Sequence, residues 1–192
     1  RSPPDRDFTC IDFCNHGNQI LVGSSLGTIF LIKLHSDGTT ENPRQIRPPA
    51  DNKGLQSPIT SILTSPCQRY VAAGTAAGSV VVLSIDNSKP IELLYNHEEH
   101  NGCHVLSLAW RADSQRLYSG ASNGQVVELN TSLSSAPPAV NFLSKVFTKE
   151  TKSICKCSKA IHQLSCSVVD NTSVVIDLLI VSSGSHAFLF QT

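Results

Sequence analysis

Two serines stand in the pattern that serine hydrolases use for their nucleophile. Residues 23–27 and residues 120–124 both match G-x-S-x-G, with Ser25 and Ser122 at the nucleophile position. A nucleophile elbow lies between an incoming strand and an outgoing helix. The β-branched and aliphatic residues that dominate the sequence after each match predict strands instead. We therefore expect no catalytic residue and no enzymatic activity, with a hydrolase as the alternative.

A second cluster holds side chains of the types that bind zinc. Four potential ligands lie within eight residues of one another: His97, His100, Cys103 and His104. A closed zinc site commonly takes short ligand pairs from two separate stretches, whereas these four come from one stretch. We expect no metal and no cofactor, and we expect His100 to form a hydrogen bond within the fold. A zinc module is the alternative.

Composition excludes several classes of partner. Fifteen basic and fifteen acidic residues give a net charge of zero, and no basic stripe accompanies the aromatic residues, so we expect no nucleic-acid binding. No apolar run is long enough to span a bilayer, so we expect no membrane insertion. Seven scattered cysteines in a chain of this size favour free thiols and a cytoplasmic location. A start at Arg1 and the absence of methionine favour an internal piece of a longer protein.

The elements that must position these residues come from an internal repeat. Residues 8–32, 59–83 and 105–129 each contain three short β-branched or aliphatic runs separated by turn residues, which predicts three strands per copy. A period in the forties with several strands per copy is typical of propeller blades. Each copy carries two glycines four residues apart, which we expect to form tight hairpins with positive φ. These hairpin glycines are Gly23 and Gly27, Gly74 and Gly78, and Gly120 and Gly124.

A fourth, weaker copy is expected over residues 161–190. The lysine-rich segment 144–159 before it predicts a solvated loop or an outer edge strand, because lysine on an edge discourages strand pairing. A docking surface for an acidic partner is the alternative for this segment. We predict an all-β chain that forms about four blades of an incomplete, larger propeller. The expected blades span roughly residues 8–58, 59–103, 104–142 and 143–192.

The third copy resembles a WD40 repeat. A strand that ends in Ala109-Trp110 is followed by the polar turn Arg111–Ser114 and then by the run Leu117–Gly124, which ends in the glycine hairpin. His100 stands where that family often has Gly-His. No copy ends in Trp-Asp, and the aspartate of the family's turn is absent, so we expect an incomplete Asp–His–Ser–Trp network and blades held together by packing.

Among WD40-like proteins, the chain is similar to the N-terminal propellers of the tectonin β-propeller repeat-containing family in Val22–Gly27, Tyr70–Gly78, Ser107–Trp110 and Leu179–Thr192. It is also similar to their Hermansky–Pudlak syndrome 5 relatives in Glu99–Val105 and Leu129–Ser132. The resemblance implies a non-catalytic interaction scaffold in vesicle trafficking and autophagy, including export from the endoplasmic reticulum. The alternative that it implies is a subunit of a complex for biogenesis of lysosome-related organelles. Implied partners are trafficking or autophagy proteins and the rest of the propeller in the same chain, with a cytoplasmic location peripheral on endomembranes.

Loops on a rigid scaffold commonly carry binding. We expect the partner-binding loops to include Cys14–Gln19, Pro66–Arg69 and Arg111–Gln115. Four blades of a larger ring leave two unpaired side faces, because full closure is what protects the edges of a propeller. We therefore expect this chain on its own to be poorly soluble or to associate with itself.

Overall fold

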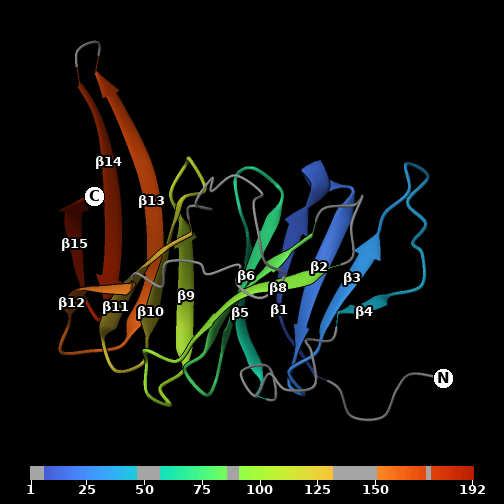
Figure 1. The fold of residues 1–192 in the computed structure, drawn as a ribbon, viewed down its shortest axis with the longest axis horizontal. Helices are drawn as coiled ribbons and strands as arrows, with labels where there is room; N and C mark the ends of the chain where they lie inside the picture. The colour runs from blue at the N-terminus through green and yellow to red at the C-terminus, as the bar shows by residue number, and fades with distance from the viewer. Residues whose placement is uncertain (1–6, 47–56, 86–90, 132–150, 172–173) are drawn as a thin grey trace, which may run out of the picture.

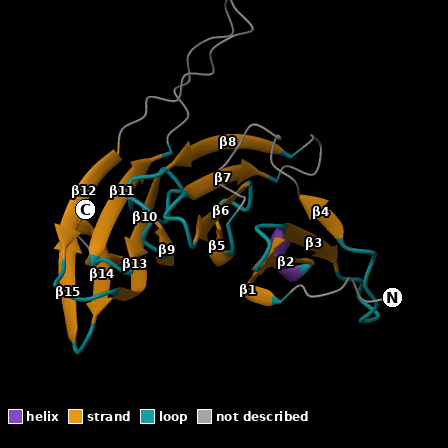
Figure 2. Cartoon of the chain, turned by 90° about the horizontal axis from the view of Figure 1, so that it is seen from below, coloured by secondary structure: helices purple, strands orange, loops and turns teal. Residues whose placement is uncertain are grey.

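Strands form almost all of the regular structure. The computed structural model describes residues 7–46, 57–85, 91–131, 151–171 and 174–192. The strands of these residues form four antiparallel sheets that follow one another along an arc (Figures 1 and 2). This arrangement confirms the prediction of an all-β chain.

Each sheet is built in chain order from its first strand outward. The first contains β1 (Phe8–Cys14), β2 (Gln19–Ser24), β3 (Ile29–Lys33) and β4 (Arg44–Ile46), with the short 3₁₀ turn η1 (Asn15–Gly17) after β1. The second contains β5 (Ile59–Thr64), β6 (Tyr70–Thr75), β7 (Val80–Ser84) and β8 (Glu92–His97). The third contains β9 (Val105–Trp110), β10 (Arg116–Ala121), β11 (Gln125–Asn130) and β12 (Thr151–Lys156). The fourth contains β13 (Ile161–Asn171), β14 (Val174–Ser183) and β15 (His186–Gln191).

The outer strand of the third sheet comes from the lysine-rich segment. β12 pairs with β11, and both Lys152 and Lys156 are exposed. Residues 144–150 of that segment lie outside the described residues. The third sheet therefore includes β12, which comes after the blade boundary expected at residue 142. Of the two structures predicted for the lysine-rich segment, a solvated loop or an outer edge strand, residues 151–156 adopt the edge strand.

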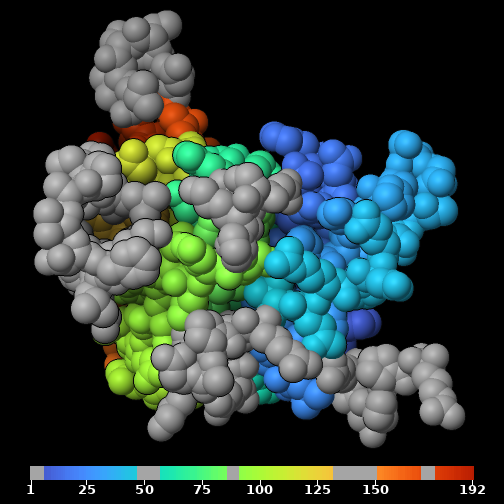
Figure 3. Space-filling model, turned by 45° about the vertical axis from the view of Figure 1, so that its right-hand side comes forward, coloured from blue at the N-terminus to red at the C-terminus, as the bar shows by residue number. Residues whose placement is uncertain are grey.

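Apolar faces pack where neighbouring sheets meet. Each core cluster combines residues of two consecutive sheets, as with Leu21 of β2 and Ile59 of β5, which are both fully buried. The first strands β1, β5, β9 and β13 are neighbours in space, so the sheets fan outward from them (Figure 2). The first and second sheets lie side by side in the space-filling view (Figure 3). Side chains that alternate along each strand thus serve two interfaces, one on each side of the sheet.

The paired glycines have two different roles. Gly27, Gly78 and Gly124 have φ values of 73°, 84° and 81° and form the turns after the second strands, as expected. The other three lie inside β2, β6 and β10, where the next sheet approaches their Cα atoms closely. An added Cβ at Gly74 would lie 2.5 Å from Cγ1 of Val105. The first glycine of each pair is therefore a packing position, which corrects the expectation that both form the hairpin.

Candidate functional site

The three loops that join the first and second strands of the first three sheets lie at the same end of the fold. They correspond to the loops expected to bind partners. Several of their residues adopt positive φ although they are not glycine: Asn15 (50°), His16 (54°), Gln68 (61°) and Ser114 (61°). Such backbone conformations are unfavourable by about 1–3 kcal/mol each and persist where surrounding contacts enforce them.

Hydrogen bonds between the loops supply those contacts. The backbone N–H of His16 donates to Oε1 of Gln68 at 3.3 Å, which joins the first loop to the second. The N–H of Cys67 donates to Oγ of Ser114 at 3.0 Å, which joins the second loop to the third. We call the residues 15–18, 65–69 and 111–115 the loop platform. Its parts are linked across sheet boundaries, so the platform presents one continuous surface.

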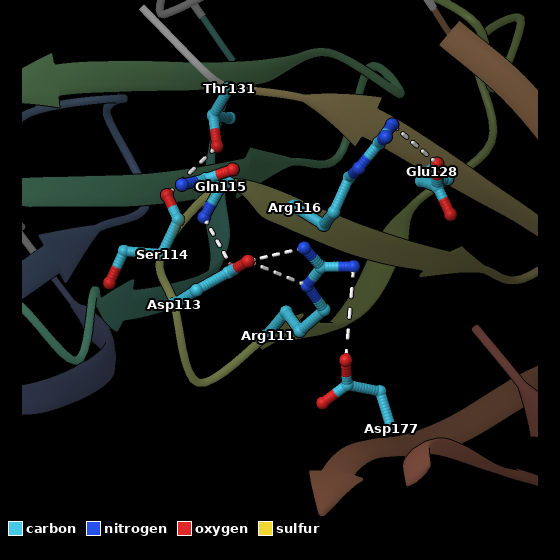
Figure 4. A network of polar contacts seen from close by, with 8 residues as sticks. All are labelled: Arg111, Asp113, Ser114, Gln115, Arg116, Glu128, Thr131 and Asp177. Carbon is cyan, nitrogen blue, oxygen red and sulfur yellow. Dashed lines mark hydrogen bonds and ion pairs between the residues drawn. The ribbon is translucent and has the colours of Figure 1, made fainter. Parts of the chain in front are cut away.

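Charged side chains extend the platform to the fourth sheet (Figure 4). Arg111 donates from Nε to Oδ2 of Asp113 at 3.0 Å, and its Nη1 lies 3.9 Å from Oδ2 of Asp177 on β14. The hydrogen bond with Asp113 raises the pKa of Arg111 and lowers the pKa of Asp113. Arg116 donates to Glu128 at 2.9 Å within the third sheet. Arg111 is thus a fixed cation at the junction of two sheets.

A groove opens beside Arg111. It has a volume of about 240 Å³ and lies between the platform and the hairpin of the fourth sheet. Its lining is mainly apolar and includes Pro66, Trp110 and Leu178, with Arg111 and Asp177 at the same site. The indole of Trp110 is buried and donates from Nε1 to the carbonyl of Leu63 at 3.2 Å, so this wall is fixed. An apolar groove with fixed charges is suited to an apolar side chain of a partner peptide.

The two serines of the hydrolase pattern lie in hairpin turns. Strand β3 follows the turn of Ser25, and strand β11 follows the turn of Ser122. A helix after the serine is what the elbow requires. Neither turn therefore has the geometry of a nucleophile elbow.

Two of the histidines considered as potential zinc ligands face the interior and the third does not. His97 and His100 are both buried, with ring centroids 6.1 Å apart, whereas His104 is exposed. Among the described residues there is no group of three or more His, Cys, Asp or Glu side chains that could hold a metal ion. His100 lies 2.8 Å from Oγ of Ser119 through Nε2, which confirms the expected hydrogen bond.

Burial controls the charge of His100. Its ring is fully buried, and desolvation lowers its pKa from the ordinary value of 6.5 to about 4. Its Nδ1 is buried without a hydrogen-bond partner. The imidazole is therefore neutral near pH 7, with one ring nitrogen bound to the hydroxyl of Ser119.

Comparison with known proteins agrees with this geometry. Residues 91–127 match the family model described as "WD domain, G-beta repeat", and the match runs from β8 through the His100–Ser119 pair to β11. The chain is a relative of the WD40-like β-propellers. The unpaired Nδ1 of His100 agrees with the incomplete Asp–His–Ser–Trp network expected of this WD40-like chain.

Solved structures share the fold of this chain at low sequence identity. The β-propeller domain of Cps50 (Swd1) from Myceliophteria thermophila superposes with a TM-score of 0.64 at 10% identity, over 94% of this chain and 51% of that one. U3-55K gives 0.65 at 15% identity, over 99% and 53%. A chain of the Mitotic Checkpoint Complex gives 0.63 at 17% identity, over 96% and 48%. The chain thus spans about half of each, which confirms the prediction of an incomplete propeller.

One curated relative is similar in sequence as well. Human (Homo sapiens) tectonin β-propeller repeat-containing protein 2 is 31% identical over 125 residues, which cover 62% of this chain and 8% of that protein. The predicted resemblance to a tectonin-type WD40-like propeller is therefore confirmed. The described part of the chain contains no helix with the length and apolar character needed to cross a bilayer.

Proposed function

We propose that this chain is a protein-interaction scaffold in vesicle trafficking and autophagy, acting at the cytoplasmic side of endomembranes. A WD40-like propeller indicates a non-catalytic protein-binding scaffold. Similarity to the tectonin protein supports the narrower pathway. The observation that carries the proposal is the groove beside Arg111, at the end of a platform whose loops are bonded to one another.

The groove defines what a partner must provide. An apolar side chain fills the space between Pro66 and Leu178, and a charged or polar neighbour on the partner reaches Arg111 or Asp177. Because the loops are already linked, binding orders little of this surface, which favours affinity. Few contacts in such a pocket commonly dominate the binding energy.

Filling the groove tests the proposal. Ala112 is exposed and lines the groove, so Ala112→Trp occupies the space that a partner's side chain would enter. Ala77 is also exposed but lies in the turn between β6 and β7, so Ala77→Trp is the matched control. Proximity labelling in cells compares both variants with the wild-type chain.

We expect the wild-type chain and Ala77→Trp to label autophagosome and endoplasmic-reticulum exit proteins. Ala112→Trp should label them about tenfold less, in line with the loss of one central contact. Equal labelling by all three proteins would contradict the role of the groove. Labelling of proteins that build lysosome-related organelles instead would select the alternative pathway.

A further inference from the structure

A second groove opens between the first and second sheets, at the end of the fold that carries the loop platform. It has a volume of about 450 Å³, which is within the size range of ligand pockets. Asn15 and Asn18 of the platform lie at one side of it. Among the described residues, it shares no lining residue with the groove beside Arg111. It is therefore a separate site, and both of its walls belong to sheets that face one another within the chain.

The floor of this second groove is the outer end of the core between the two sheets. Leu31 of β3 and Ile85, which follows β7, are buried in the same core cluster, and Ile91 packs against that cluster. All three line the groove. Because the core holds these side chains in place, the floor offers a fixed apolar surface that suits an aliphatic side chain of a ligand.

Strand pairing places two cationic side chains above this floor. Arg44 of β4 pairs with Leu31, and directly paired residues project from the same face of a sheet. Lys33 follows Leu31 by two positions in β3, so it also shares that face. Both cations line the groove. The face of the first sheet that forms the core deeper in the fold therefore becomes cationic at the groove.

One carboxylate of the chain already contacts this cationic rim. Oε2 of Glu41 lies 3.3 Å from Nζ of Lys33, and Oε1 of Glu41 lies 3.8 Å from Nε2 of His35. The backbone N–H of Glu41 also donates to the carbonyl of Lys33 at 3.1 Å, which fixes these two residues side by side. The rim thus accommodates a carboxylate next to the apolar floor.

Arg44 supplies positive charge that this contact leaves uncompensated. Its side chain is exposed and forms no ion pair with any residue that the structure describes. Lys33 and Arg44 outnumber Glu41, so the groove has a net positive charge although the whole chain has none. Protonation of His35 adds to that charge. A guanidinium beside an apolar surface suits a carboxylate that stands next to an aliphatic residue.

We propose that this second groove binds an acidic segment of a partner protein, with an aliphatic side chain over the apolar floor and a carboxylate at Arg44. The charge of the groove selects this class of segment, because a basic segment would meet Lys33 and Arg44 with like charge. The exposed carboxamides of Asn18 and Asn42 line the same groove and can form hydrogen bonds with the backbone of the segment.

Selection from a library of short random peptides displayed on phage tests this chemistry. The immobilised wild-type chain should enrich peptides in which an aliphatic residue is flanked by aspartate or glutamate. Arg44→Glu should shift the preference toward lysine and arginine. Lys152→Glu is the matched control, because it also reverses an exposed positive charge on the outer strand of a sheet but does not line the groove. It should enrich the same peptides as the wild-type chain.

Fluorescence anisotropy with an enriched peptide then measures the affinity. Arg44→Glu should raise the dissociation constant at least about tenfold, because a charged contact becomes a repulsion. Glu41→Gln should lower it about threefold, because the carboxylate that competes for Lys33 is removed. A gain in affinity cannot come from a misfolded variant. Both residues are exposed, so their replacement should not alter circular dichroism.

Enrichment of peptides without acidic residues would overturn the proposal, and so would the same enrichment by Arg44→Glu as by the wild-type chain. Failure of the wild-type chain to enrich any peptide would overturn it as well. Vesicles of phosphatidylcholine and phosphatidylserine provide the comparison with a membrane surface. Vesicle binding that depends on Arg44, without enrichment of acidic peptides, would assign the groove to an anionic lipid surface instead of a protein segment.

Discussion

At the scale of single residues, His100 links the WD40-like packing to pH. Its pKa in the folded chain is about 4, below the ordinary value of 6.5, so the unfolded chain binds more protons between these values. Stability is therefore complete above about pH 6.5 and falls as the pH drops toward 4. Urea denaturation at pH 7 and pH 5 should show that His100 contributes a loss of about 2 kcal/mol at pH 5.

The stability of the whole chain can depend on pH through more than one group, so the measurement needs a matched variant. His100→Gln keeps a group that can bond to Ser119 but does not titrate. The difference in pH dependence between wild type and this variant isolates His100. Identical pH dependence in both proteins would show that the buried imidazole is not responsible.

Cys67 should be a more reactive thiol than Cys166. Burial raises its pKa, but hydrogen bonds with Ser65 and Ser114 and the neighbouring Arg69 outweigh that effect, so the net pKa is lowered. Burial holds the pKa of Cys166 at about 12. Because the thiolate is the nucleophile, iodoacetamide at pH 7.5 should modify Cys67 well before Cys166, as followed by peptide mass spectrometry. Modification of Cys166 first would refute this order.

At the scale of strands and sheets, the packing glycines set the distance between neighbours. Gly74→Ala places a Cβ against Val105 and Ser61, and overpacking of this kind typically destabilises by about 1–3 kcal/mol. We expect a loss of about 2 kcal/mol in urea denaturation. Val105→Ala also destabilises, by leaving a cavity, but it removes the obstructing methyl groups.

The double variant therefore distinguishes a steric cause from a loss of backbone flexibility. Gly74→Ala combined with Val105→Ala should be less destabilised than the sum of the single variants, by at least about 1 kcal/mol. Strict additivity would indicate that the conformational preference of glycine, rather than the approach of Val105, explains the effect.

The strands could be predicted from the sequence because they recur in each repeat. The same recurrence suggested one role for both glycines of a pair, although one forms a turn and the other is a packing position. Alternating apolar runs and fixed turns indicate strand, hairpin and period together. The role of Gly23 depends on Ile59, thirty-six residues away. The four-residue spacing between the two glycines of a pair gives no information about that contact. The strand β12 was ambiguous for a similar reason, because its pairing with β11 spans a long connection.

The positions of the platform loops could be predicted from the sequence, but the contacts between these loops could not. Polar turns between strands mark Arg111–Gln115 as an exposed loop. The bond between Cys67 and Ser114 joins loops of different sheets, and the groove needs Asp177 from a fourth sheet. Such contacts follow from how the sheets fan out, which local patterns do not specify. Gln68 and Ser114 adopt positive φ without glycine, so composition gave no signal for their conformation.

At the scale of the whole molecule, each sheet is stabilised mainly by its neighbours. In a stacked array, stability is approximately the sum of the stabilities of the units and of their nearest-neighbour contacts. The second and third sheets are covered on both faces by described residues, whereas the first and fourth each have one open face. Local opening should therefore start at the ends of the arc.

Hydrogen exchange of the chain should resolve this gradient. Amides of β6 and β10 should exchange at least about tenfold more slowly than those of β2 and β14, because opening an end sheet breaks one junction instead of two. Leu26→Asp changes an exposed leucine in a hairpin turn and should leave these exchange rates unchanged. Uniform exchange would mean that the four sheets open as a single cooperative unit, and stability would then not follow the nearest-neighbour contacts.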